Sequence, residues 1–433
     1  MAGERTLKRL GEICEFRGGQ GFPQKHQGAI IGEYPFIKVS DMELPGNRHR
    51  ITRANHWIDE ATRKELHAKP HPATSTVFAK IGIALTYNRR RLLSRPTIVD
   101  NNMMAAVPIE SEVVPVFLYY LLKATDFNEV VSGTALPFIN GSDLAKMEVE
   151  IPPLLEQRAI AKVLEALDEK IELNHRMNAT LAAMARALFQ NWFVDFNPVR
   201  AKLDGRKPTG LDEATTALFP ATFQNSPLGP IPQGWEVATV GAIGDVVCGK
   251  TPPTAVSDYY GEDVPFITIP DMHGNVFAAS TARKLSQAGA NSQANKTLPP
   301  GSLCVSCIAT PGLVVITSED SQTNQQINSV VPHQTQETYF WYWVLTGLGA
   351  EIASSGSGGS VLANLSKGRF ETLQVINPPH TLIHAYHTTV RPLFENILAN
   401  THQSRTLATL RDALLPKLLS GELGVAEIPS KPN

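Results

Sequence analysis

Tyr34-Pro-Phe-Ile-Lys-Val-Ser-Asp-Met42 recurs 230 residues later as Val264-Pro-Phe-Ile-Thr-Ile-Pro-Asp-Met272, with Pro, Phe, Ile, Asp and Met unchanged. The same offset relates Leu10-Gly-Glu-Ile13 to Val240-Gly-Ala-Ile243, and an offset of 226 relates Ile151-Pro-Pro-Leu154 to Asn377-Pro-Pro-His380. Solenoid units recur every ~20–50 residues, so this period is too long for a solenoid. The sequence therefore predicts two copies of a complete module, each a globular head followed by a long helix.

Each head contains short hydrophobic runs separated by Gly, Pro and Asn, a pattern that favours strands. We expect one mixed head over residues 1–151 and a second over residues 231–376. The predicted strands cover residues 35–39, 81–87, 146–151 and 373–376, and the predicted helices of the heads cover residues 116–123 and 338–345.

Long helices are expected after both heads, over residues 152–196 and 377–421. Apolar residues recur there at alternating four- and three-residue steps, which is the seam of a coiled coil. Asn174 and Asn400 interrupt the two seams at the same place, and a buried Asn fixes register and partner. We expect the helices to pair with each other, antiparallel; the alternative is that each packs only on its own head. The expected seam residues are Leu164, Leu167, Ile171, Asn174, Leu181, Leu393, Ile397, Asn400 and Leu407.

The predicted fold class is therefore α+β, with two mixed α/β heads, two long helices in an antiparallel coiled coil, and a pseudo-twofold internal repeat. Residues 197–230 are rich in Pro and Gly and are expected to connect the first helix to the second head. Residues 422–433 are expected to form a flexible tail.

The composition suits a cytoplasmic globular protein of two or three domains, with 42% hydrophobic and 18% charged residues among 433. We expect no signal peptide and no membrane span, and four cysteines fit a reducing compartment. The net charge of −2 gives no whole-chain argument for nucleic acid. Residues 1–110 carry 17 Lys and Arg against 11 Asp and Glu, whereas residues 231–375 carry 6 against 11. The basic first head suits a polyanionic partner.

Three motif matches do not support chemistry on this chain. Residues 244–251 satisfy the P-loop pattern, but Pro252 disfavours the helix that a P-loop needs at that point. Asn377-Pro-Pro-His380 resembles an amine-holding motif of methyltransferases, yet its counterpart at residues 151–154 has no polar group. Cys304-x-x-Cys307 lacks a second ligand pair for zinc, and the helix-spaced His380, His384 and His387 have no accompanying carboxylate. No catalytic residue and no metal ligand is predicted.

Four strings are similar to the specificity subunit of type I DNA restriction-modification enzymes, and the likeness covers almost the whole chain. They are Pro152-Pro-Leu-Leu-Glu-Gln-Arg158, Ala187-Leu-Phe-Gln-Asn-Trp-Phe-Val-Asp-Phe196, Leu228-Gly-Pro-Ile-Pro-Gln-Gly-Trp-Glu236 and Leu410-Arg-Asp-Ala-Leu-Leu-Pro-Lys-Leu-Leu-Ser-Gly-Glu-Leu423. The resemblance implies that each head is a target recognition domain for one half of a split double-stranded DNA sequence. It also implies that the paired helices set the gap between half-sites and dock two methyltransferase subunits. Those partners bring S-adenosylmethionine, and a separate motor-nuclease subunit performs cleavage, so this chain is expected to be non-catalytic and to hold no cofactor.

Base readout in the major groove favours Arg on guanine and Asn or Gln on adenine, whereas other Lys and Arg residues bind phosphate. In the first head the expected base contacts are Arg89, Arg90, Arg91, Asn101 and Asn102, with Arg48 and Arg50 on phosphate. In the second head the loop at residues 321–326 matches residues 100–102. Its expected base contacts are Asn324, Gln325 and Gln326, with Lys250, Arg283 and Lys284 on the backbone.

Two other functions remain open at this point. An autonomous DNA methyltransferase or endonuclease would need a cofactor loop or an acidic metal cluster, and neither is evident. A protein scaffold without DNA would use the two heads as adaptors. Neither the recognised bases nor the presence of a nuclease partner follows from the sequence.

Overall fold

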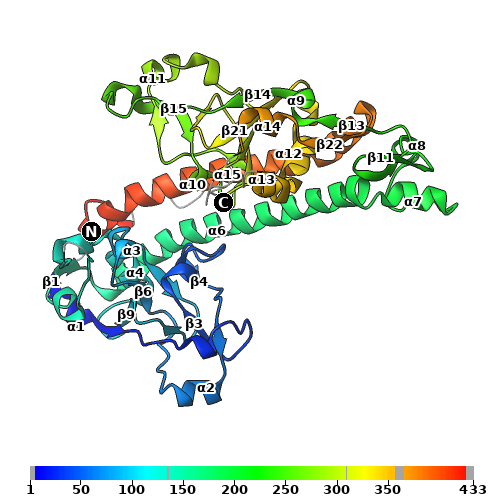
Figure 1. Ribbon diagram of the computed structural model, residues 1–433. Coiled ribbons are helices and arrows are strands. Elements are labelled where there is room, and N and C mark those ends of the chain that lie inside the picture. Colours follow the sequence, from blue (N-terminus) through cyan, green and yellow to red (C-terminus); the bar gives the residue numbers. More distant parts are fainter. Residues whose placement is uncertain (1–4, 134–135, 309, 356–364, 426–433) are drawn as a thin grey trace. The chain divides into compact units, whose positions relative to one another are not determined.

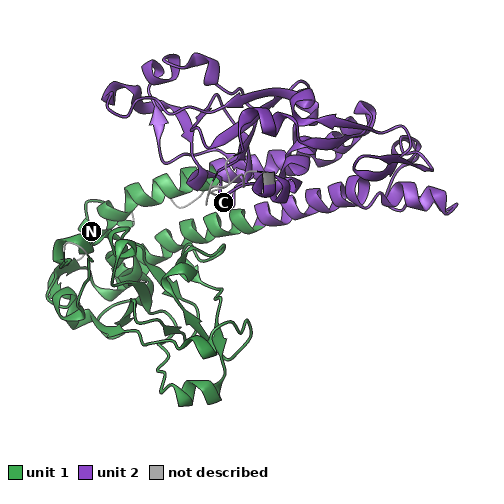
Figure 2. Cartoon of the chain, in the orientation of Figure 1, with its two compact units in different colours: residues 1–176, 403–433 green, residues 177–402 purple. Residues whose placement is uncertain are grey.

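The computed structural model describes residues 5–133, 136–308, 310–355 and 365–425. The chain forms two compact units, one of residues 1–176 and 403–433 and the other of residues 177–402 (Figure 2). The long helices α6 (Leu154–Phe189) and α15 (His380–Ser420) both pass from one unit into the other. Each unit therefore contains one head and part of both helices. No helix in the described ranges combines the length and apolar character needed to cross a lipid bilayer.

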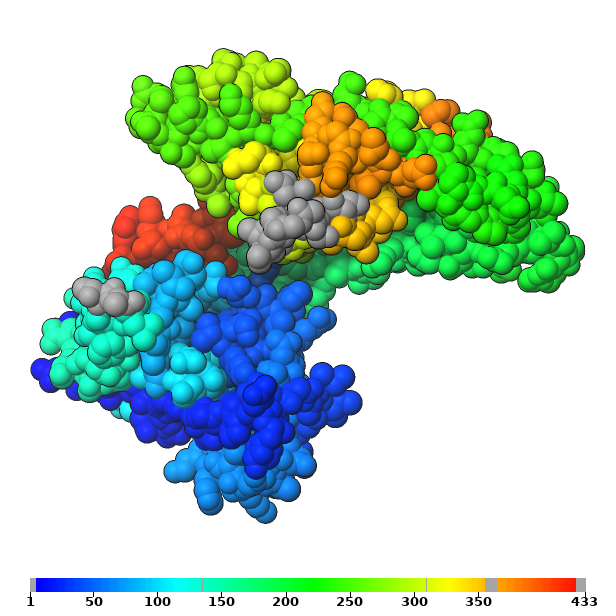
Figure 3. All heavy atoms as spheres, viewed as in Figure 1, coloured from blue at the N-terminus to red at the C-terminus, as the bar shows by residue number. Residues whose placement is uncertain are grey.

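In the described part of the first head there are ten strands and five helices. The strands are β1 (Thr6–Arg9), β2 (Cys14–Gly18), β3 (Tyr34–Ile37), β4 (Arg50–Ile51), β5 (Trp57–Ile58), β6 (Thr76–Ala79), β7 (Arg91–Leu93), β8 (Ile98–Val99), β9 (Met103–Pro108) and β10 (Glu148–Ile151) within the described residues. The helices there are α1 (Leu10–Ile13), α2 (Glu60–Glu65), α3 (Ile83–Thr86), α4 (Pro115–Ala124) and α5 (Gly141–Leu144). Helix α2 lies at the end of this head that is remote from α6 (Figures 1 and 3).

Within the described residues, the second head repeats the ten strands of the first but has six helices. Its strands are β13 (Glu236–Thr239), β14 (Gly244–Cys248), β15 (Tyr260–Ile267), β16 (Phe277–Ala278), β17 (Lys284–Leu285), β18 (Leu303–Ser306), β19 (Val314–Thr317), β20 (Gln322–Thr323), β21 (Ile327–Pro332) and β22 (Gln374–Asn377). Its helices are α9 (Val240–Ile243), α10 (Ile269–Met272), α11 (Gln287–Asn291), α12 (Thr338–Gly347), α13 (Gly349–Ser355) and α14 (Lys367–Glu371).

The two heads share one strand topology, which confirms the predicted repeat (Figure 1). The five-stranded sheet runs β2-β9-β6-β7-β4 in the first head and β14-β21-β18-β19-β16 in the second. The three-stranded sheets run β5-β3-β8 and β17-β15-β20, and the pairs β1–β10 and β13–β22 complete the heads. Parallel pairing also occurs at matching places, between β4 and β7 and between β16 and β19.

The repeated stretch is retained because its identical residues have the same structural roles in both heads. The carboxylate of Asp41 accepts the backbone N–H groups of Lys38 (2.6 Å) and Asn55 (2.8 Å). In the second head the carboxylate of Asp271 accepts those of Thr268 and Ala282, both at 2.8 Å. Each Asp thus satisfies two backbone N–H groups, one just before it in the turn after the strand and one farther along the chain. The buried apolar members are Phe36, Ile37, Met42, Phe266, Ile267 and Met272.

The predicted strand over residues 81–87 is wrong, whereas the predicted helices at 116–123 and 338–345 are α4 and α12. Strand β6 ends at Ala79, and α3 forms a single helical turn after Gly82. Gly82 has φ +79, a conformation that suits glycine and turns the chain out of the sheet. Ile83 and Tyr87 are 70% and 57% exposed, and of this apolar run only Leu85 packs into the core.

Helices α6 and α15 run antiparallel in each unit. In the first unit, Asp168 contacts Arg411, and the side-chain amide of Asn174 donates to Ser404 Oγ (3.2 Å). In the second unit, the side-chain amide of Asn400 donates to Asn178 Oδ1 (3.0 Å). The helices therefore do not pack only on their own heads. Leu164, Asn174 and Ile397 are buried, and the other expected seam residues are half-buried: Leu167, Ile171, Leu181, Leu393, Asn400 and Leu407.

The remaining boundaries differ by a few residues from those expected. Helix α6 starts at Leu154 and continues into a π-helical turn at Gln190–Val194. Residues 197–230 are largely folded onto the second unit and contribute buried Phe219 to its core. They contain α7 (Asn197–Leu203), α8 (Glu213–Ala217) and the hairpin of β11 (Phe223–Ser226) and β12 (Gly229–Pro232). In the expected tail, Leu423 and Val425 pack against the hydrophobic core of the first unit. Residues 426–433 lie outside the described residues.

Candidate nucleic-acid interface

A glycine crossing follows β2 in the first head. The backbone N–H of Gly19 donates to the carbonyl of Met103, and that of Gln20 donates to the carbonyl of Val99, both at 3.0 Å. A Cβ atom on Gly19 would lie 2.0 Å from the carbonyl oxygen of Asp100. Only glycine fits this close backbone approach, which holds the loop after β2 against the turn between β8 and β9.

The second head contains the same crossing after β14. The N–H of Gly249 donates to the carbonyl of Ile327 (3.0 Å), and that of Lys250 donates to the carbonyl of Thr323 (2.9 Å). A Cβ atom on Gly249 would lie 2.1 Å from the carbonyl oxygen of Asn324. The turn between β20 and β21 is therefore the structural counterpart of the turn between β8 and β9, which is the correspondence expected from the sequence.

Each of these turns presents side-chain amides. Asn101 and Asn102 are both exposed, whereas in the second head Gln325 is exposed and Gln326 half-buried. Gln325 Oε1 accepts the hydroxyl of Thr251 at 2.7 Å. Side-chain amides of this kind can donate to and accept from an adenine edge. We call residues 101–102 and 325–326 the two reading turns.

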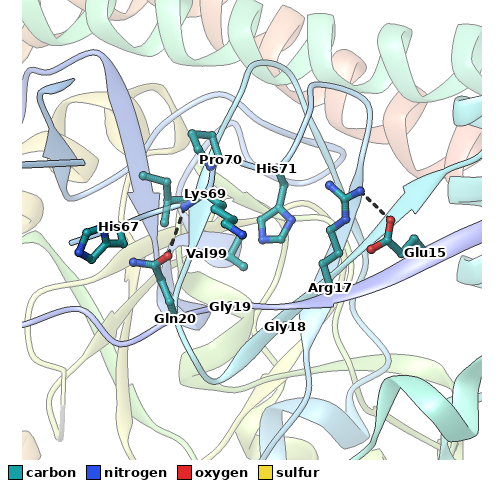
Figure 4. Close-up of a pocket in the computed structure, with 11 residues that line it drawn as sticks. Glu15, Arg17, Gly18, Gly19, Gln20, His67, Lys69, Pro70, His71 and Val99 are labelled. Atoms are coloured by element: carbon teal, nitrogen blue, oxygen red, sulfur yellow. Dashed lines mark hydrogen bonds and ion pairs between the residues drawn. The ribbon is translucent and has the colours of Figure 1, made fainter. Parts of the chain in front are cut away.

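An open basic groove with a volume of about 540 Å³ lies over the first crossing. Figure 4 shows Lys69, His71 and Arg17 side by side above the backbone of Gly18 and Gly19. Burial, together with the charge of Arg17, lowers the pKa of His71 to about 4, so this imidazole is neutral at pH 7. The positive charge of the groove comes from Lys69 and from Arg17, which also pairs with Glu15 at 2.6 Å. Neither Arg17 nor Lys69 was among the residues expected from the sequence.

Arg48 and Arg50 contact α6. Arg50 forms an ion pair with Glu165, and Arg48 Nη1 lies 2.7 Å from His175 Nε2. Burial and the charge of Arg48 lower the pKa of His175 to about 4, so the neutral imidazole can accept this hydrogen bond. Both arginines, expected on phosphate, hold the head on α6 in this structure.

The same face of α6 carries a buried charge. Asp168, 4% exposed, pairs with Arg411 of α15, accepts the hydroxyl of Tyr120 (2.8 Å), and lies 3.3 Å from His49 Nδ1. Burial alone would raise the pKa of Asp168. The contact with His49 and the charges of Lys123 and Arg411 outweigh burial and hold this pKa below its ordinary value.

The structure contradicts the prediction that Arg90 reads a base. Its side chain is 2% exposed, with the guanidinium 3.7 Å from the ring centroid of Phe127 and 5.1 Å from that of Phe78. Desolvation lowers the pKa of Arg90 to about 9. A cation held between aromatic rings in the core cannot reach a groove edge without unfolding part of the head.

The other predicted cations lie nearer the surface. Arg89 pairs with Glu43, and Arg91 is half-buried and donates to the carbonyl of Met42 at 3.1 Å. In the second head, Arg283 is exposed, with its guanidinium 4.7 Å from the ring centroid of Tyr260. The ammonium of Lys284 donates to the carbonyl of Glu262 at 3.0 Å, and Lys250 is exposed.

The histidines at the start of α15 have a carboxylate neighbour that sequence spacing did not reveal. Glu337, 3% exposed, contacts His380 Nδ1 and lies 3.8 Å from His384 Nε2. The described residues nevertheless contain no group of three ligands placed to hold a metal ion. Cys304 and Cys307 are buried, and burial raises the thiol pKa values to about 12 and about 11.

Comparisons with known proteins converge on one family. A family model described as the type I restriction modification DNA specificity domain matches residues 4–183 and 232–381. The type I restriction enzyme HindI specificity subunit of Haemophilus influenzae is 35% identical over 373 residues, covering 75% of this chain and 81% of that protein. The MjaIX specificity subunit of Methanocaldococcus jannaschii is 27% identical and covers 98% of this chain and 94% of that protein. The crystal structure of the S subunit from M. genitalium covers 96% of both chains with a TM-score of 0.53 at 16% identity, which supports the fold.

Proposed function

This chain belongs to the family of type I restriction-modification DNA specificity subunits, and we propose that it reads a bipartite DNA target, one half with each head. The observation that carries this proposal is the duplicated reading turn. In each head a glycine crossing holds two amide-bearing residues at the same place between equivalent strands. The two turns differ in sequence, Asn101-Asn102 against Gln325-Gln326, as two unlike half-sites require.

The long helices would set the distance between the half-sites. Helix α6 has 36 residues, a length of roughly 54 Å at ~1.5 Å per residue. Its pairing with α15 is supported in each unit by polar contacts inside the seam, which specify register as well as contact. A fixed register between the two helices would fix the number of base pairs between the half-sites. Two short half-sites at a constant separation are then recognised together as one longer target.

Methyltransferase subunits are the partners that this reading requires, with motor-nuclease subunits joining them for cleavage. The chemistry would belong to those partners, and S-adenosylmethionine would bind there. The role of this chain is then positioning and sequence discrimination, which needs direct contacts to base edges and to phosphates but no reacting group.

Methylation sequencing tests the proposal. A strain that carries the gene and its partner methyltransferase should methylate a motif of two defined parts separated by a constant gap, and deletion of the gene should abolish that methylation. Replacement of Asn101 and Asn102 by Ala should change only one part of the motif, and replacement of Gln325 and Gln326 only the other. An unchanged methylome after deletion, together with failure to co-purify a methyltransferase, would overturn the proposal.

A further inference from the structure

Lysines occupy equivalent positions beside the two reading turns. In the first head, Lys69 lies two residues before His71, whose backbone pairs with that of Thr97 in an antiparallel bridge. Four residues after Thr97 the chain reaches Asn101 in the first reading turn. The lysine is therefore placed next to the strand β8 that leads into that turn, and it lines the basic groove.

The second head repeats this arrangement with the same spacings. Lys296 lies two residues before Leu298, whose backbone pairs with that of Ser321 in an antiparallel bridge. Four residues after Ser321 the chain reaches Gln325 in the second reading turn. The carbonyl of Lys250, next to the glycine crossing, accepts the side-chain amide of Gln293 at 2.8 Å, which ties this segment to the crossing.

The neighbours of the two lysines differ, whereas the lysines themselves do not. His71 is replaced by Leu298 in the second head, and Arg17, three residues before the bridge residue Gln20, corresponds to Val247 at the offset of 230. The chain length from lysine to reading turn also differs, 32 residues in the first head and 29 in the second. Both heads nevertheless have a lysine at the same structural position.

Both ammonium groups are available to a ligand. Lys69 is exposed and Lys296 half-exposed, and within the described ranges no acidic side chain pairs with either ammonium. In contrast, the exposed Lys146 and Lys367 pair with Asp143 and Glu371, at 3.3 and 3.4 Å. A lysine ammonium is a point charge that suits phosphate and carries no base code.

Because both half-sites share the same phosphodiester backbone but differ in their bases, we propose that Lys69 and Lys296 are equivalent phosphate anchors. Each lysine binds a DNA phosphate beside its half-site and holds its reading turn in register, without itself selecting a base. This inference rests on the proposed DNA-reading function and assigns to it a contact that both heads have in common.

The salt dependence of DNA binding tests this inference. The full chain, co-purified with its methyltransferase partner, is titrated with a duplex containing the methylated motif between about 50 and 200 mM salt, a range over which phosphate contacts dominate the change in affinity. Lys69→Ala and Lys296→Ala should each reduce the magnitude of the slope of log K against log salt by about 1, and the double variant by about 2. Lys69→Arg should keep the slope, and Lys146→Ala and Lys367→Ala serve as matched controls that leave it unchanged.

The methylated motif distinguishes an anchor from a base reader. If the lysines are anchors, the alanine variants lose affinity equally for cognate and unrelated duplexes, and the motif is the same as in the wild type. A wild-type complex that binds its motif normally, with slopes unchanged in both variants, would overturn this inference alone. Relaxed specificity at one base in either variant would also overturn it. Absence of motif-dependent binding by the wild-type complex would instead refute the proposed function.

Discussion

Replacing Asp168 by Ala should destabilise the first unit by about 4–5 kcal/mol. Removing one partner of a buried ion pair typically costs ~3–5 kcal/mol, because the remaining charge loses its counterion. The lower half of that range applies here, since the side chain of Arg411 is 14% exposed and retains Asp412 at 2.8 Å. Tyr120 adds about 1 kcal/mol, because its buried hydroxyl loses its acceptor.

The measurement must be local, because a chain of two units need not unfold in one step. Hydrogen exchange followed by mass spectrometry on peptides from α4 and from residues 154–176 reports the stability of the first unit. Glu169→Ala, on the exposed side of the same helix, is the matched control and should change stability by less than about 0.5 kcal/mol.

A double-mutant cycle isolates the ion pair. Asp168→Ala combined with Arg411→Ala should cost less than the sum of the single changes by about 1–3 kcal/mol, since the orphaned charge is gone. A coupling below about 0.5 kcal/mol, or a loss below about 1 kcal/mol for Asp168→Ala alone, would refute the reasoning.

The stability of the first unit at acidic pH should also depend on the Asp168 carboxylate. The pKa of Asp168 in the folded protein lies below its ordinary value of 3.8, so its stabilising contribution is complete above that value. The contribution is lost as the pH falls through the lower pKa of the folded state. Between pH 5 and pH 3, the Asp168→Ala variant should therefore lose less stability in the first unit than the wild type does.

Four further substitutions probe the heads. Arg90→Ala should destabilise the first head by roughly 2–4 kcal/mol through lost contacts in the core, measured by hydrogen exchange; a folded variant with altered specificity would show that it reads a base after all. Asn101→Ala and Gln325→Ala should each weaken discrimination by ~1–3 kcal/mol at a base of one half-site, measured by competition between duplexes. Gly249→Ala should displace the carbonyl of Asn324, and methylation sequencing should then show a degenerate second half-site beside an intact first one. An unchanged motif in that variant would contradict the assigned role of the crossing.

Internal duplication made the architecture predictable from one sequence. Residues such as Asp41 and Asp271 recur at a constant offset because each satisfies backbone donors in a turn that the fold cannot omit. The long helices were predictable for a related reason, since their seam pattern persists over many turns. The strand prediction over residues 81–87 is wrong because an apolar run does not indicate that the backbone turns out of the sheet at Gly82.

The candidate site was predictable only in part. The reading turns could be inferred because they are polar and occupy matching places in both copies. Three adjacent arginines at residues 89–91 look alike in sequence, yet Arg90 alone is packed between Phe78 and Phe127. The partner of Arg50 is Glu165, 115 residues away, and no local pattern connects them. The equivalence of Lys69 and Lys296 is not visible in the sequence, because the chain between each lysine and its reading turn differs in length.

The P-loop match at residues 244–251 shows how a motif can arise from geometry without its chemistry. Gly249 is required because a Cβ atom at this position would lie 2.1 Å from the carbonyl oxygen of Asn324. Gly19 meets the same constraint in the first head, where Gln20 follows it and the pattern is absent. After Thr251 the chain forms no α-helix before β15, so no helix N-terminus faces a phosphate there. The glycine is held by the crossing, and Lys250 is free to differ from Gln20 because its backbone alone makes the shared hydrogen bond.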